Sequence, residues 1–170
     1  MIGDLKERAD LADAGGLGEL YRAHAPEALR VAYLMTGQRA LAEDLVQDAF
    51  VRCIGRLGHL RHQDSFPGYL RRTVLNLARM HFRRGRSERA RLESIAAHTP
   101  AVETPDAIQV EAVRVALLGI PYRQRAAIVL RYYCELPDAE TAVALRCAPG
   151  TVRSLISRGL DRLRVLLREG

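Results

Sequence analysis

The chain has 170 residues, enough for one ordinary domain or two small ones, and 48% of them are hydrophobic. Its low aromatic content (5%) and few β-branched runs argue against long strands, and no apolar run approaches the ~18 residues of a membrane span. Residues 1–50 carry a charge balance of −4 and residues 51–170 a balance of +10. This asymmetry predicts an acidic docking surface for a protein and a basic surface for a polyanion.

Several functional classes have no support in the sequence. Residues 1–10 lack the apolar segment of a secretory signal, so we expect a cytoplasmic protein that does not insert into membranes. Cys53, Cys134 and Cys147 are far apart and form no CxxC pair, which favours reduced, buried thiols over a metal site. The absence of a Gly-rich phosphate loop or a nucleophile–base motif argues against an enzyme, and no cofactor is expected.

Helical periodicity dominates the chain, which predicts an all-α fold. Pro26 allows a break in the first helix, Gly37 can end it, and Pro67 suits the first turn of the third helix. Residues 92–108, with two prolines and no apolar period, are typical of a linker, so the chain divides into two helical modules. The predicted helices cover residues 17–36, 40–57, 66–89, 106–118, 121–133, 138–146 and 149–168.

The helix over 40–57 has an unusual outward face. Ala42, Val46, Ala49, Phe50, Cys53 and Leu57 form its core stripe. The outward arc consists of Asp44, Gln47, Asp48 and Val51. The two like charges at i,i+4 slightly destabilise an isolated helix, and an exposed valine among acids is typical of protein docking. A basic partner would explain both features, although an ordinary solvated face stays an equal alternative on the charge pattern alone.

The helix around Asn76 carries an arginine stripe. Leu70, Val74, Leu77, Ala78 and His81 fall on one side. The opposite side presents Arg72, Asn76, Arg79 and Arg83, and residues 71–84 hold five arginines and no acid. Arginines can hold phosphates and an amide can pair with a base edge, so this face predicts nucleic-acid contact. The loop 59–66, with His62 and Asp64, could cradle an unstacked base together with Asn76; the alternatives are a solvated face and an ordinary loop.

A short helix, a tight turn and a longer helix over 138–168 form a helix-turn-helix pattern. The polar face of the second helix begins with Thr151, Arg153, Ser154, Ser157 and Arg158. Small hydroxyl residues allow close approach to DNA and arginine reaches bases or phosphates, so this face suits the major groove. Many helix pairs share the outline and bind nothing, so the outline alone leaves both interpretations open.

Four blocks together resemble the extracytoplasmic-function (group 4) sigma factors of bacterial RNA polymerase. They are LYRAHAPEALRVAYLMTG, AEDLVQDAFVR, FPGYLRRTVLNLARMHFRR and IPYRQRAAIVLRYY…AETAVAL…GTVRSLISRGLDRLR. They occur in the family's order over nearly the whole chain, from about residue 17 to 164, with a proline-containing linker between the third and fourth.

The resemblance implies a separate role for each segment of the chain. It implies a tail over 1–16, a region 2 domain over 17–88 that binds core polymerase and the −10 element, a linker over 89–106, and a region 4 domain over 107–170 that reads the −35 element. Core polymerase would meet Asp44, Gln47, Asp48 and Val51 through its β′ coiled coil, and the β flap is the other implied contact on the polymerase. The −10 DNA would meet His62, Asp64, Arg72, Asn76, Arg79 and Arg83. The −35 DNA would meet Thr151, Arg153, Ser154, Ser157 and Arg158. An anti-sigma factor is the expected regulator.

Some positions depart from the family pattern. Tyr69 replaces the usual tryptophan and Thr141 a usual aliphatic residue. Arg146 replaces a turn glycine, at a position that often needs positive φ, and Ala148 lacks the hydroxyl that could cap the next helix. The main rival interpretation is a dimeric helix-turn-helix regulator, which explains the second half of the chain but not the acidic arc or the arginine stripe.

Overall fold

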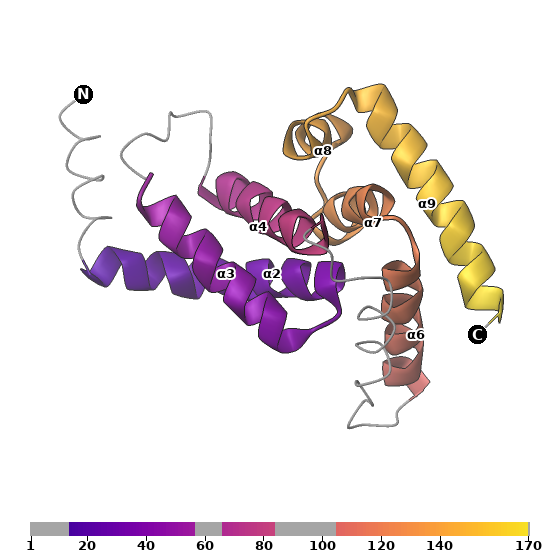
Figure 1. Cartoon of the computed structure of the whole chain (residues 1–170), viewed down its shortest axis with the longest axis horizontal. Coiled ribbons are helices and arrows are strands. Elements are labelled where there is room, and N and C mark those ends of the chain that lie inside the picture. The colour runs from indigo at the N-terminus through magenta and orange to yellow at the C-terminus, as the bar shows by residue number, and fades with distance from the viewer. Residues whose placement is uncertain (1–13, 57–65, 84–104, 170) are drawn as a thin grey trace.

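The computed structural model describes residues 14–56, 66–83 and 105–169. Every regular element in these ranges is helical, which confirms the predicted all-α fold. The first three helices are α2 (Ala14–Thr36), α3 (Arg39–Ile54) and α4 (Phe66–Arg83), and they form one group in Figure 1. Most of the predicted tail 1–16 and most of the predicted linker 89–106 lie outside the described residues.

Helix α2 runs without interruption through Pro26, where the sequence allowed a break. Pro26 is exposed, so the carbonyl group that loses its partner one turn earlier can be hydrated. Gly37, with φ 74°, ends the helix as predicted, and its N–H donates to the carbonyl oxygen of Tyr33 at 2.7 Å.

Helices α2, α3 and α4 bury one apolar core. Val31, Met35, Val46 and Val74 from these helices are fully shielded from solvent. The core stripes predicted for α3 and α4 are confirmed at nine positions, namely Ala42, Val46, Ala49, Phe50, Cys53, Leu70, Val74, Leu77 and Ala78. Leu57 lies outside the described residues, and His81 is only half-buried.

The later helices pack around the long last one. They are α6 (Pro105–Gly119), α7 (Tyr122–Ile128), the π-helix η2 (Val129–Tyr133), α8 (Asp138–Leu145) and α9 (Pro149–Glu169). Helix α9 contacts α6, α7 and α8. At Gly159 a Cβ atom would lie 2.8 Å from Cδ1 of Ile128, so glycine lets α9 lie this close to α7 without displacing that side chain.

The predicted helix 121–133 is one continuous helix: its first part is α7, and its second part widens into the π-helix η2. The N–H of Cys134 donates to the carbonyl oxygen of Val129 at 3.1 Å, which is the i to i+5 bond of a π-turn. Glu135, with φ 54°, then turns the chain towards α8.

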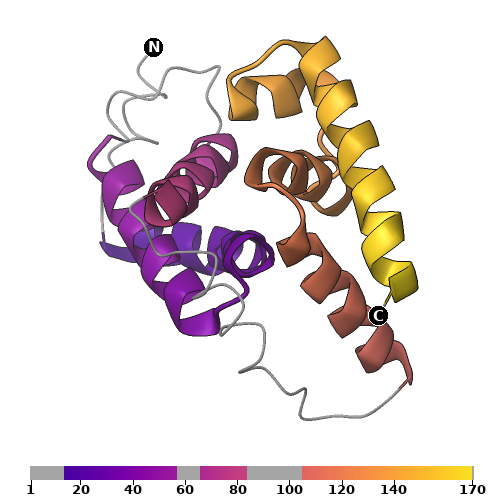
Figure 2. The ribbon, with the colours of Figure 1, turned by 45° about the vertical axis from the view of Figure 1, so that its right-hand side comes forward.

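The two groups of helices pack directly against each other, as Figure 2 shows from a second side. Arg114 of α6 is buried, with its Nη1 3.4 Å from the carbonyl oxygen of Gly37 and its guanidinium 5.2 Å from the Tyr33 ring centroid. The Tyr122 hydroxyl donates to the carbonyl oxygen of Leu75 at 2.6 Å. Ala126, Val129 and Leu130 join the core formed by α2, α3 and α4. The sequence predicts two linked modules but not this shared core.

Candidate nucleic-acid and protein interfaces

The acidic arc predicted on α3 is one exposed face of the structure. Asp44, Gln47, Asp48 and Val51 are all exposed. Val51 keeps 71% of its surface accessible, although Val46, five residues earlier and on the opposite side of the helix, is fully buried. A solvent-exposed apolar side chain beside two carboxylates is a surface that a basic, partly apolar protein can bind and cover. The role of these four residues in docking stays a prediction.

The arginine stripe predicted on α4 faces away from the core. Asn76, Arg79 and Arg83 are exposed, and Arg72 is half-buried. The Arg72 guanidinium lies 5.9 Å from the ring centroid of Tyr69, one turn earlier on the same helix, which orients it by a cation–π contact. The structure therefore brings the four α4 residues to one face. His62 and Asp64, the other two residues predicted to meet DNA here, lie outside the described residues.

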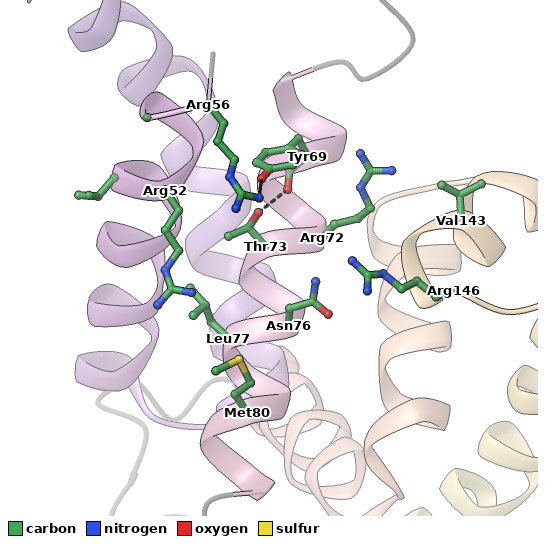
Figure 3. A pocket seen from close by; sticks show the side chains of 12 residues that line it. Arg52, Arg56, Tyr69, Arg72, Thr73, Asn76, Leu77, Met80, Val143 and Arg146 are labelled. Atoms are coloured by element: carbon green, nitrogen blue, oxygen red, sulfur yellow. Dashed lines mark hydrogen bonds between the residues drawn. The ribbon is translucent and has the colours of Figure 1, made fainter. Parts of the chain in front are cut away.

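A pocket of about 660 Å³ lies between α3, α4 and the end of α8. Figure 3 shows Arg72 and Asn76 of α4 on its wall, with Arg146 reaching towards them from α8. Arg52 and Arg56 complete a group of four arginines. Arg52, Arg56 and Arg146 were not predicted as parts of this site. The i,i+4 spacing of Arg52 and Arg56 was a signal, but only the packing of α8 on α4 brings Arg146 to them.

Hydrogen bonds fix part of the pocket wall. The Arg56 Nη1 donates to the Tyr69 hydroxyl at 3.0 Å, and the Thr73 hydroxyl donates to the Tyr69 carbonyl oxygen at 2.9 Å. The bond from Arg56 orients the Tyr69 ring, which stands where the family usually has tryptophan. The substitution to tyrosine therefore keeps an aromatic wall and adds a hydroxyl that binds an arginine.

The turn between α8 and α9 has the left-handed geometry that is expected where the family has glycine. Arg146 adopts the left-handed conformation, with φ 51° and ψ 58°, which a glycine would adopt without strain. The N–H of Cys147 donates to the carbonyl oxygen of Ala142 at 3.0 Å and closes the turn. The Ala148 carbonyl accepts the N–H groups of Thr151 and Val152, so the backbone starts α9 at Pro149 without a hydroxyl on Ala148.

The predicted DNA-reading face of α9 is exposed as a unit. Its members are Thr151, Arg153, Ser154, Ser157 and Arg158. Val152, on the opposite face, is fully buried and anchors the start of the helix. Asp138, at the start of α8, was not predicted as part of this face. Its carboxylate lies 4.0 Å from Nε of Arg153 and 3.7 Å from Nε of Arg131. The carboxylate thus lies beside Arg153, a predicted DNA-reading side chain that stays mostly exposed.

The three cysteines lie in different environments. All three cysteines are unpaired; Cys53 is buried, whereas Cys134 and Cys147 are only partly so. Burial is the main cause that raises the pKa of Cys134 to about 12, so this thiol stays protonated at neutral pH. In the part of the chain that the structure describes, no cluster of three or more His, Cys, Asp or Glu side chains could hold a metal ion. None of the helices described there is long and apolar enough to cross a bilayer.

Comparison with known proteins matches two separate parts of the chain to family models. Residues 20–88 match Sigma-70 region 2, and residues 111–163 match Sigma-70, region 4. The chain is 31% identical over 150 residues to the RNA polymerase sigma-E factor of Streptomyces avermitilis, covering 86% of this chain and 82% of that protein. It is 33% identical over 159 residues to the ECF RNA polymerase sigma factor SigM of Mycobacterium tuberculosis, covering 91% and 79%.

Two solved structures share the fold. The sigma factor RpoE from Bartonella quintana, solved with the anti-sigma factor NepR, has a TM-score of 0.72 at 23% identity, with 89% of this chain and 96% of that chain covered. CnrH, solved with the cytosolic domain of CnrY, has a TM-score of 0.71 at 24% identity, with 95% of each chain covered. The matches to both sigma regions and the identity to curated relatives agree with the motifs in the sequence. The chain belongs to the extracytoplasmic-function group of the sigma-70 family, and it is an RNA polymerase sigma factor.

Proposed function

We propose that this chain binds core RNA polymerase and directs the holoenzyme to promoters through two separate DNA-reading surfaces. The observation that supports this most strongly is the presence on one chain of the acidic face of α3, the arginine stripe of α4 and the exposed face of α9. A simple DNA-binding regulator needs only the last of these. Residues 17–88 would act as the first functional domain and residues 107–170 as the second.

The acidic face of α3 is our proposed contact with core polymerase. Asp44 and Asp48 would pair with the basic β′ coiled coil, and Val51 would supply an apolar anchor, because its side chain is 71% exposed. Gln47 lies between them and can exchange hydrogen bonds. Residues 107–170 would contact the β flap. No residue of this chain is proposed to be catalytic, because nucleotide chemistry belongs to the polymerase.

The −10 element would meet α4 as melted DNA. An exposed amide such as that of Asn76 can donate to and accept from the edge of an unstacked base. Arg72, Arg79 and Arg83 would hold the phosphates, and these contacts would offset the cost of unstacking. His62 and Asp64 are assigned to the same site by the family resemblance.

The −35 element would meet α9 as duplex DNA. The first turns of this helix present Thr151, Arg153 and Ser154, and the next turn presents Ser157 and Arg158. The hydroxyl residues allow close approach to the major groove, and the two arginines can form paired hydrogen bonds with guanine. Asp138, 4.0 Å from Arg153, would limit the orientations of that arginine.

An anti-sigma factor is the proposed regulator. The two solved structures that share this fold are complexes with NepR and with the cytosolic domain of CnrY. We infer that an unlinked protein of that kind covers the two functional domains of this chain in the cytoplasm and releases them on a signal.

Run-off transcription tests the proposal against the rival regulator. The chain is mixed with sigma-free core polymerase and a set of genomic promoter fragments, and transcripts are scored. New promoter-specific transcripts are expected only when the chain is present. A dimeric helix-turn-helix regulator would bind the fragments and yield no transcripts, and that result would overturn the proposal.

A further inference from the structure

Four arginines line the pocket between α3, α4 and α8, and the functions proposed above do not use them as a group. Arg52 lies in the last turn of α3, Arg56 in the turn that follows it, Arg72 in α4, and Arg146 directly after α8. Among the described residues that line the pocket there is no carboxylate. Positive side chains on the wall of a pocket attract an anion that enters it. The charge pattern therefore suits a ligand that carries several phosphate oxygens.

The backbone at Arg146 adds a second, independent observation. Its left-handed conformation, φ 51° and ψ 58°, is costly for any residue with a Cβ atom. Residues held in such conformations cluster at ligand-binding and switch positions. Here the strained position carries the side chain that reaches from α8 towards Asn76 and Arg72 in Figure 3. Contacts between the Arg146 guanidinium and a ligand would offset the free-energy cost of the left-handed backbone.

The remaining wall can recognise a base. Tyr69 offers an aromatic ring that is held by a hydrogen bond from Arg56 and lies 5.9 Å from the Arg72 guanidinium. Asn76 offers an amide, whose donor and acceptor match the edge of a purine or pyrimidine. The volume of about 660 Å³ falls in the range of sites for small organic ligands, roughly 300–1,000 Å³.

We propose that this pocket binds a free nucleotide with two or more phosphate groups, which holds α8 against α4. The arginines take the phosphates, and Tyr69 and Asn76 take the base. A melted DNA strand also offers phosphates and bases, but a requirement for Arg146 distinguishes a free nucleotide from such a strand. It belongs to the later helices, so it lines the pocket only while the two groups of helices are in contact. A bound nucleotide competes with single-stranded −10 DNA for Arg72 and Asn76, a consequence that rests on the function proposed above.

Calorimetric titration of the full chain tests the site. The probes are ATP and GTP without magnesium, and inorganic pyrophosphate as the probe that lacks a base, all at one ionic strength. Arg146→Gln removes the charge, and Arg146→Gly removes both the charge and the backbone strain, so loss of binding in both is not a folding defect. The matched control is Arg162→Gln, an equal loss of charge on the exposed face of α9. Loss of one charge-assisted contact should weaken nucleotide binding about tenfold or more in both Arg146 variants, and less than about twofold in the control.

Two outcomes overturn the proposal. One is an absence of saturable nucleotide binding, and the other is equal weakening by Arg146→Gln and Arg162→Gln, which would mean non-specific attraction. A parallel titration with a single-stranded oligonucleotide distinguishes the ligand sources. Its binding should be weakened by Asn76→Ala and unchanged by Arg146→Gln, and equal loss in both variants without nucleotide binding would make Arg146 a DNA contact. Nucleotide binding is measured without polymerase, so it can succeed even if the run-off assay fails.

Discussion

Gly37→Ala is expected to destabilise the chain by about 2–5 kcal/mol, which is large for a single methyl group. Gly37 has φ 74°, and an alanine in this left-handed region costs about 1–2 kcal/mol. The added Cβ would lie 2.5 Å from Cδ1 of Leu118, whose side chain is almost completely buried, so the contact cannot relax into solvent. Forcing one extra carbon into a packed site costs about 1–3 kcal/mol more. Because Leu118 belongs to α6, the second cost acts between the two groups of helices.

Urea denaturation of four proteins separates the two costs. They are the native chain, Gly37→Ala, Leu118→Ala and the double variant. Leu118→Ala alone should cost about 2–5 kcal/mol because it leaves a cavity. It also makes room for the new methyl group, so Gly37→Ala in that background should cost only the backbone part, about 1–2 kcal/mol. Gly37→Asn is the further control, since asparagine tolerates the left-handed region but still carries a Cβ atom.

The reasoning is refuted if the two substitutions are additive. Additivity would mean that Leu118 does not press on residue 37, so the helix groups would not be packed as described. A loss below about 0.5 kcal/mol for Gly37→Ala would also contradict it, because the backbone cost alone exceeds that value. In contrast, a coupling of about 1–3 kcal/mol would show that the end of α2 and α6 share one interface.

Three further predictions concern the proposed surfaces and the buried thiol. Asp48→Arg should abolish binding to core polymerase in a pull-down while circular dichroism stays unchanged, whereas Asp161→Arg on α9 should leave core binding intact. Asn76→Ala should impair promoter opening, measured by permanganate reactivity, more than it impairs core binding; equal effects would contradict base capture. The pKa of Cys134 is raised from 9.0 to about 12, so between those pH values the unfolded thiol ionises first and stability falls as pH rises. Cys134→Ala should remove that component of the pH dependence, and identical pH profiles would count against it.

Helix faces could be predicted well because burial follows the 3.6-residue period. Val46 and Val74 repeat with their neighbours at helical spacing, so the sequence itself indicates which side of α3 and α4 is buried. The same rule identified the exposed sides with Asp48 and Asn76. The left-handed turn at Arg146 could be anticipated because the resemblance marks a glycine position there. These are local properties, and each depends on a few consecutive residues.

Contacts between distant segments could not be predicted in the same way. Periodicity shows that Leu130 is on an apolar face, but not that this face joins the core of α2, α3 and α4. Arg114 resembles any helical arginine until its burial against Gly37 and Tyr33 is seen. The four-arginine pocket depends on the approach of α8 to α4, and nothing near Arg146 in the sequence indicates Arg72 as its neighbour.

The contact between the two helix groups has a consequence for promoter binding on the assignment proposed above. Elements named −10 and −35 are about 25 base pairs apart, or about 85 Å of duplex at 3.4 Å per pair. A compact chain of this length has a radius of gyration of about 15 Å and a diameter of about 40 Å, so it cannot reach both elements at once.

Separation of the two groups is therefore required, and the chain length permits it. The stretch between Arg83 and Pro105 can span up to about 70 Å when fully extended, which together with the helices is enough to cover the distance. The interface formed by Gly37, Arg114 and Tyr122 must then break before both elements are bound. Substitutions that weaken it without unfolding either group should favour promoter binding, and a nucleotide held between Arg72 and Arg146 should oppose it.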